Sequence, residues 1–206
     1  SSIPTKEDML LVLQQRHGKE LQSKFSNSSV AICGLGGLGS NIAIALARAG
    51  VGKLILIDFD KVDLSNLNRQ QYFISQIGMY KTEALKDNLK QIAPYIKIDV
   101  HTVRISESNI KLLLSDANII CEAFDRAEEK AMLVNYIAEN LSQKYLVSAS
   151  GMAGMSSANS IKTRKVAKHL YLCGDEISDV SYDIGLVSSR VMVCAAHQAH
   201  MILRII

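Results

Sequence analysis

The chain has 206 residues, of which 48% are apolar and 21% charged, and 23 basic against 20 acidic side chains give a net charge of +3. A chain of this length buries roughly 70% of the surface of its unfolded form, so one domain spanning 1–206 needs no disulfide or metal for stability. The small charge is spread along the chain, which argues against DNA binding, and no uncharged apolar run is long enough to span a membrane.

The first 150 residues alternate between helical and strand patterns. Residues 1–28 hold a polar helical stretch, Lys6 to Phe25, which His17-Gly18 divides into two short helices. From 29 to 150, short β-rich runs alternate with helices, which predicts an α/β, Rossmann-like fold with a mostly parallel sheet and helices on both faces. The predicted strands are 29–33, 54–58, 97–102, 118–121 and 145–148. The predicted helices between them are 38–49, 81–91 and 125–141, with Asp125 near the N-cap of the last.

The remaining residues predict a loop and a closing helix. Small and polar residues dominate 151–184, which we expect to be a mobile crossover loop that carries function. A basic patch lies within it at Lys162, Arg164, Lys165, Lys168 and His169. We expect its acidic side chains to be solvated, namely Asp175, Glu176, Asp179 and Asp183. An apolar helix at 185–206 then closes the domain.

The four cysteines form no CxxC pair and stand at positions 33, 121, 173 and 194. Cys33 and Cys121 lie inside apolar runs, where a buried, reduced thiol is expected. Cys173 is the one thiol that we expect to be exposed. Reduced thiols and the lack of a charged-then-apolar leader at the N-terminus predict a cytoplasmic protein.

A glycine-rich turn follows the first predicted strand and opens a helix. Its glycines, Gly34, Gly36 and Gly39, satisfy G-x-G-x-x-G, a pattern that lets backbone N–H groups approach a phosphate. Asp58 ends the second predicted strand, where a carboxylate accepts hydrogen bonds from a ribose. These features predict nucleotide binding, and NAD is the default ligand.

The next segment argues for a triphosphate over NAD. A triphosphate carries about four negative charges, more than one helix N-terminus offsets. Arg69 can bind phosphate with two N–H groups, and Lys81 supplies a second positive charge. Asp125, after the fourth predicted strand, is placed to hold a Mg²⁺ ion that bridges phosphate oxygens.

At this point the sequence resembles the ThiF/MoeB-type enzymes that activate ubiquitin-like proteins. The resemblance covers residues 16–150 and is carried by GLGGLGSN, GVGKLILIDFDKVDLSNLNRQ, Gly78-Met79-Tyr80-Lys81 and Phe124-Asp125. It implies that the nucleotide is held by Gly36, Gly37, Asp58 (ribose), Asn66, Arg69 and Lys81 (phosphates) and Asp125 (metal). It further implies a homodimer in which Arg16 reaches the triphosphate of the partner subunit, although Arg16-His17-Gly18 departs from the family's RYxRQ pattern.

The resemblance implies that the C-terminal glycine carboxylate of a ubiquitin-like protein attacks the α-phosphate of ATP. The product is an acyl-adenylate, and the short chain looks most like the ThiF-like subgroup that activates the ThiS-like sulfur carrier of thiamine biosynthesis. A separate sulfur donor protein would follow, and a sulfur or thioester role for Cys173 stays open. Structural zinc is not expected, because the family's CxxC pairs are missing.

Two other classes of function remain open. A related branch of the superfamily dehydrates a modified, threonylcarbamoyladenosine-type tRNA base with ATP, and the basic patch at 162–169 would then contact RNA. The chain could also be a non-catalytic nucleotide-binding module or an NAD enzyme. Arg69, Lys81 and Asp125 argue against both of these last readings.

Overall fold

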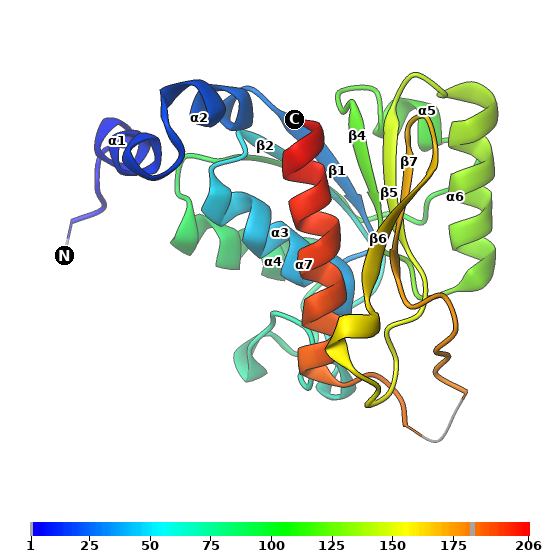
Figure 1. Ribbon diagram of the computed structural model, residues 1–206. Helices are drawn as coiled ribbons and strands as arrows, with labels where there is room; N and C mark the ends of the chain where they lie inside the picture. The colour runs from blue at the N-terminus through cyan, green and yellow to red at the C-terminus, as the bar shows by residue number, and fades with distance from the viewer. Residues whose placement is uncertain (1, 182–183) are drawn as a thin grey trace.

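The computed structural model describes residues 2–181 and 184–206. Seven strands form one sheet in the order β3-β2-β1-β4-β5-β7-β6, and every neighbouring pair is parallel except β6 and β7 (Figure 1). The strands are β1 (Ser29–Cys33), β2 (Lys53–Ile57), β3 (Lys97–His101), β4 (Ile119–Glu122), β5 (Tyr145–Ala149), β6 (Lys162–Ala167) and β7 (Leu170–Gly174).

Helices cover both faces of the sheet. The helices are α1 (Lys6–His17), α2 (Lys19–Ser26), α3 (Gly37–Ala49), α4 (Lys81–Ile92), α5 (Ile110–Leu113), α6 (Ala127–Asn140) and α7 (Ser188–Ile205), with short 3-10 turns η1 (Leu64–Asn66), η2 (Ile74–Gln76) and η3 (Ala158–Ser160). One core joins α3, α4 and α7 to the sheet, and a second core joins α5 and α6 to the opposite face. Within the described part of the chain, no helix has the length and apolar character to cross a membrane.

The central strands are apolar throughout because both of their faces are covered. In β1, Ile32 packs in the core beneath α3 and α7, whereas its neighbour Cys33 packs in the core beneath α6. From β1 the chain adds β2 and then β3 on one side of β1. It then crosses back and adds β4 on the other side, so the strand order reverses between β1 and β4. Ligands of open α/β sheets bind at the carboxyl ends of the strands beside such a reversal.

The predicted Rossmann-like fold is confirmed, with corrections in two places. Helix α6 begins at Ala127, two residues later than expected, and its N-cap is Arg126, which directly follows Asp125. The second correction concerns 151–184, which was expected to be a loop. Residues 162–174 of it form the antiparallel hairpin β6–β7, which extends the sheet beyond β5.

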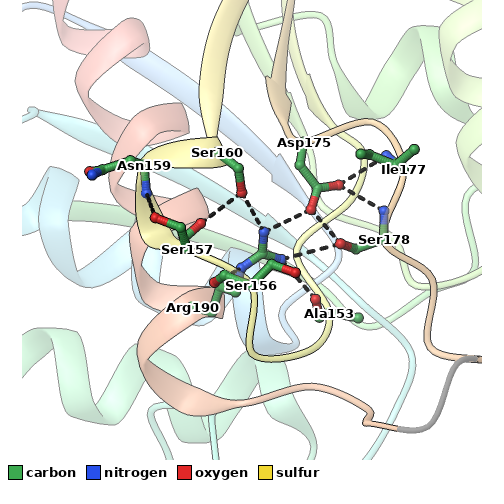
Figure 2. A network of polar contacts seen from close by, with 9 residues as sticks. All are labelled: Ala153, Ser156, Ser157, Asn159, Ser160, Asp175, Ile177, Ser178 and Arg190. Carbon is green, nitrogen blue, oxygen red and sulfur yellow. Dashed lines mark hydrogen bonds and ion pairs between the residues drawn. The ribbon is translucent and has the colours of Figure 1, made fainter.

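Arg190 of α7 ties the segments on either side of this hairpin together (Figure 2). Its guanidinium donates to the backbone oxygens of Ala153 and Ser156 at 2.7 and 3.0 Å. It also donates to Ser160 Oγ at 2.8 Å and forms an ion pair with Asp175 Oδ2 at 2.7 Å. The side chains of Asp175 and Arg190 are each only 4% exposed, so the expectation of a solvated Asp175 carboxylate is wrong.

The other acidic side chains of this region differ from Asp175. Glu176 pairs with Arg164 of the exposed strand β6 at 2.7 Å and remains 42% exposed. Asp179 is exposed, as expected. Asp183 lies outside the described residues.

Candidate functional site

A pocket opens at the carboxyl ends of β1, β2 and β4, at the point where the strand order reverses. Its walls include residues from five separate segments of the chain. Among them are Gly34, Gly36, Asp58, Lys81, Ala123 and Asp125. The structure therefore brings five of the predicted site residues to one pocket.

Close backbone contacts explain the glycines of the turn. Gly34 has a φ of 94°, and a Cβ added there would lie 2.6 Å from the carbonyl oxygen of Ala123. A Cβ on Gly39 would overlap the carbonyl oxygen of Gly34. Tyr72 holds the turn from outside, since its hydroxyl donates to the carbonyl oxygen of Leu35 at 2.7 Å. The turn is thus fixed with its backbone close to the pocket.

Asp58 ties the glycine turn to the end of β2. Its Oδ2 accepts a hydrogen bond from the N–H of Leu35 at 2.7 Å, and its Oδ1 accepts one from the N–H of Asp60 at 2.7 Å. Burial raises the pKa of Asp58 above its usual value and outweighs these hydrogen bonds, which lower it. Each oxygen keeps a second lone pair for a ligand hydroxyl.

Asp125 and Arg69 lie against the glycine turn from two sides. A Cβ added to Gly36 would lie 3.6 Å from Asp125 Oδ2. A Cβ added to Gly37 would lie 3.4 Å from Arg69 Cγ. The Nη1 of Arg69 donates to Ser65 O at 3.2 Å and to a neighbouring amide oxygen at 2.8 Å. Its buried Nε has no hydrogen-bond partner among the residues that the structure describes. Arg69 does not line the pocket itself, but its side chain lies beside the turn, where a fixed guanidinium with an unused N–H suits an anionic ligand.

Lys81 and Asn66 differ in their relation to the pocket. Lys81 is 5% exposed, lines the pocket and begins α4, with its N–H donating to Asp60 O at 3.0 Å. Asn66 does not line the pocket. Its Oδ1 accepts from Asp63 N–H at 2.8 Å and closes the turn η1, which positions the residues leading to Arg69.

Arg16 stays apart from the other predicted site residues. It lies in the last turn of α1, a helix without a buried residue, and is itself exposed. Figure 1 shows α1 at the outer end of the molecule beside α2, away from the carboxyl ends of the strands. Within one chain, Arg16 therefore does not contribute to this pocket.

A buried ion pair beneath the pocket was not foreseen from the sequence. Glu122, which is fully buried, accepts from Lys130 Nζ and from Ser148 Oγ, both at 2.5 Å. Its second oxygen accepts from the N–H of Phe124 at 2.8 Å, and Lys130 also donates to Ala149 O at 2.6 Å. This network holds the segment from Glu122 to Phe124, which leads directly to Asp125.

Cys173 is buried, so the expectation of an exposed thiol is wrong. It lies in β7 at 0% exposure, and burial raises the pKa of its thiol. Among the described residues, the polar contact of its thiol is with Thr163 Oγ1 at 3.4 Å. Reactive cysteines have lowered pKa values and access to solvent, and this thiol has neither property.

Comparison with known proteins decides the family. Residues 10–206 match the model of the ThiF family. The chain belongs to the ThiF family. The predicted ThiF/MoeB-type membership is therefore confirmed, and the match extends past residue 150 to the end of α7.

Curated relatives and a solved structure agree with this membership. The tRNA threonylcarbamoyladenosine dehydratase of Escherichia coli is 30% identical over 74% of this chain and 57% of its own length. Adenylyltransferase and sulfurtransferase UBA4 of Kluyveromyces lactis is 34% identical over 69% of this chain and 32% of its own. The chain thus spans less than two thirds of these curated relatives.

The likeness in fold extends further than the likeness in sequence. The structure of the E. coli dehydratase in complex with ATP superposes with a TM-score of 0.87 over 98% of this chain and 96% of that chain. The TM-score shows that the two proteins share a fold. Because they are only 21% identical, this likeness shows the fold alone.

Proposed function

We propose that the protein is an ATP-dependent enzyme that activates a carboxylate as its acyl-adenylate and releases pyrophosphate. The observation that carries this proposal is that Asp125 lies beside one central glycine of the turn and Arg69 beside the other. A cation with an unused N–H and a carboxylate beside a phosphate-binding turn match the needs of a triphosphate. An NAD enzyme or a degenerate module would have no use for this set.

The residues in and beside the pocket would divide the work of this reaction. The N–H groups of the glycine turn and the start of α3 receive the phosphates, and Asp58 accepts from the ribose hydroxyls. Arg69 and Lys81 neutralise the charge that develops as pyrophosphate leaves. A substrate carboxylate is ionised at neutral pH and attacks the α-phosphorus without a general base. Catalysis then consists of positioning and charge neutralisation.

Asp125 is the proposed ligand for Mg²⁺. The described residues contain no cluster of three or more His, Cys, Asp or Glu side chains that would hold a metal by protein ligands alone. The site fits Mg²⁺ nevertheless, because Mg²⁺ is usually held by one or two carboxylates together with substrate phosphates. When bound, the ion would supply charge neutralisation at the phosphate oxygens beside Gly36.

Of the two candidate substrates, the modified tRNA base has more support from the curated relatives than a ubiquitin-like protein has. The E. coli tRNA threonylcarbamoyladenosine dehydratase matches 74% of this chain, and it is matched over more of its own length than UBA4. The threonyl group of such a base carries a carboxylate that ATP can activate. Exposed Lys162, Lys165 and Lys168 on and after β6 offer contacts for RNA phosphates.

A ThiS-like sulfur carrier is the second candidate substrate, with a role in thiamine biosynthesis. The likeness to UBA4 and to ubiquitin-like modifier-activating enzyme 5 of Caenorhabditis elegans supports it. In this reading the chain acts as a homodimer, Arg16 reaches the partner subunit's triphosphate, and a separate protein donates sulfur. The buried Cys173 favours a sulfur step outside this chain.

ATP/pyrophosphate exchange tests the proposal and separates the two substrates. The purified protein is incubated with labelled pyrophosphate, ATP and Mg²⁺, once with tRNA carrying threonylcarbamoyladenosine and once with a ubiquitin-like protein ending in Gly-Gly. Exchange that depends on one of them identifies the substrate. Tight NAD binding without any exchange would contradict the proposal.

A further inference from the structure

The pocket continues past Asp58 into a part that phosphate and ribose contacts do not use. Phe59, Val103 and Ile105 line it with apolar side chains, and Glu129 of α6 lines it with a carboxylate. Along the sheet edge, the glycine turn follows β1, Asp58 follows β2 and Val103 comes after β3. A nucleotide with its phosphates at the turn and its ribose at Asp58 therefore directs its base into this part.

Glu129 is poorly satisfied by the protein itself. Its side chain is 15% exposed, and its Oε1 lies 3.5 Å from Arg104 Nη1, a distance typical of an ion pair without a good hydrogen bond. Within the described residues no donor bonds Oε1. Burial raises the pKa of Glu129, and the charge of Arg104 opposes this rise. A desolvated acceptor in a pocket wall is unfavourable until a ligand N–H reaches it.

Arg104 also contacts Phe59, one of the apolar side chains that line this part of the pocket. Its guanidinium carbon lies 4.4 Å from the centroid of the Phe59 ring, in a cation–π contact. Arg104 thus positions Phe59 and Glu129 together, one as a flat apolar surface and the other as a hydrogen-bond acceptor. A planar base with an N–H group at its edge fits both.

We propose that Glu129 determines nucleobase specificity by accepting a hydrogen bond from the 6-amino group of adenine. This inference rests on the proposed function, since it requires a nucleoside triphosphate in the same pocket. Adenine presents an N–H donor at this position, whereas guanine presents a carbonyl oxygen that the carboxylate repels. Glu129 acts on binding and takes no part in the chemical step.

A purely structural role for Glu129 makes a different prediction. Acidic residues in a first helical turn stabilise the helix, and Glu128 shares that turn with Glu129. Glu128 is exposed and does not line the pocket, so Glu128→Val is the matched control. Loss of a helix-stabilising charge would affect both variants and would weaken all nucleotides equally.

The test compares the dissociation constants of ATP and of purine riboside triphosphate, which lacks the 6-amino group, by calorimetric titration. We expect the wild-type protein to bind ATP about tenfold to a hundredfold more tightly. This ratio should fall to near one in Glu129→Val and stay at the wild-type value in Glu128→Val. Glu129→Gln keeps an acceptor oxygen without the charge, so part of the ratio should remain.

Equal wild-type binding of both nucleotides, an unchanged ratio in Glu129→Val, or tighter binding of GTP than of ATP would overturn the inference. If Glu129→Val does not fold, an undiminished ratio in Glu129→Gln would overturn it in the same way. Failure of the inference remains distinct from failure of the proposed function. A protein that catalyses exchange but shows no ratio contradicts only the role of Glu129, whereas the expected ratio without any exchange contradicts only the reaction.

Discussion

Arg190 Nη2 and Asp175 Oδ2 lie 2.7 Å apart in an ion pair that is almost fully buried, and the same guanidinium holds backbone oxygens of the segment after β5 (Figure 2). The pair thus joins α7 to the chain on both sides of the β6–β7 hairpin. Residues 185–187 in turn reach the loop that carries Arg69, since Asn68 Nδ2 donates to Leu186 O at 3.0 Å. Contacts at both ends therefore join the region expected to be mobile to α7 and to the loop that carries Arg69.

Removing one partner of this pair should destabilise the fold. Asp175→Asn leaves the Arg190 guanidinium buried without a counter-charge, which should lower the free energy of unfolding by about 3 kcal/mol. Urea denaturation measures the change. Asp179→Asn, in an exposed position of the same loop, is the control and should change stability by less than about 0.5 kcal/mol. Equal effects of both variants would contradict the assigned role of the pair.

The same pair predicts acid sensitivity. Burial alone would raise the pKa of Asp175, but the hydrogen bonds from Ser178, Arg190 and Ile177 hold it well below its usual 3.8. A carboxyl with a lower pKa in the folded than in the unfolded state stabilises the protein fully above the unfolded value. That contribution should be lost as the pH falls below about 4, and the loss should be smaller in Asp175→Asn. Stability measured from pH 6 to pH 2 tests this, and parallel curves for the two proteins would refute it.

Two charged residues should be needed for catalysis and not for folding. Arg69→Ala and Asp125→Ala should each abolish exchange, with rate losses of at least about a hundredfold. The first change removes a positive charge beside the phosphates, and the second removes the proposed ligand of the Mg²⁺ ion that would neutralise them. Cys173→Ala should spare the reaction, since its thiol is buried away from the pocket. Thermal unfolding confirms that the variants fold. Full exchange activity in Asp125→Ala would contradict the metal assignment.

The glycine turn should tolerate no side chain. Gly39→Ala places a Cβ on the carbonyl oxygen of Gly34, so the turn must move and ATP binding should weaken by at least about tenfold. Gly185→Ala is a matched control, because a Cβ there meets no atom of residues 2–181 and 184–206 within 4 Å. Calorimetric titration with ATP compares the two variants. Unchanged affinity in Gly39→Ala would mean that the phosphates bind elsewhere.

Arg16 predicts complementation between subunits. Neither Arg16→Ala nor Arg69→Ala should be active alone, but a mixture should form dimers with one intact site. With random pairing in equal amounts, about a quarter of the wild-type exchange activity should return. Absence of recovery, with mixed dimers shown to be present, would exclude action across the interface.

Local patterns of the sequence predicted most of the sheet. The predicted ends of eight elements lie within two residues of the observed ends: β1 to β5, α3, α4 and α6. These elements could be predicted because apolar residues recur along helices and strands with known periods. The sequence also points to Gly34, Asp58 and Lys81, which the structure places in the pocket lining, because glycine turns and strand ends have local signatures. Asp125 also lines the pocket, one residue before the N-cap of α6.

The features that were missed depend on distant partners. Strand β6 is exposed at every residue and contains two lysines and an arginine. Its sequence therefore shows no alternation of apolar and polar residues and predicts a loop. Asp175 is buried only because Arg190, 15 residues later, compensates its charge. Glu129 and Arg104 meet across the pocket from α6 and the segment after β3. No local pattern reports such pairs, which form only when the sheet has assembled.

Attack of a carboxylate on the α-phosphorus of ATP is the central claim, and an isotope transfer tests it most directly. The substrate identified by exchange is prepared with ¹⁸O in its carboxylate, and the products of a complete turnover are analysed by mass spectrometry. The account predicts pyrophosphate together with AMP that carries one ¹⁸O from the substrate. Formation of ADP with ¹⁸O in inorganic phosphate, or of AMP without ¹⁸O, would contradict it.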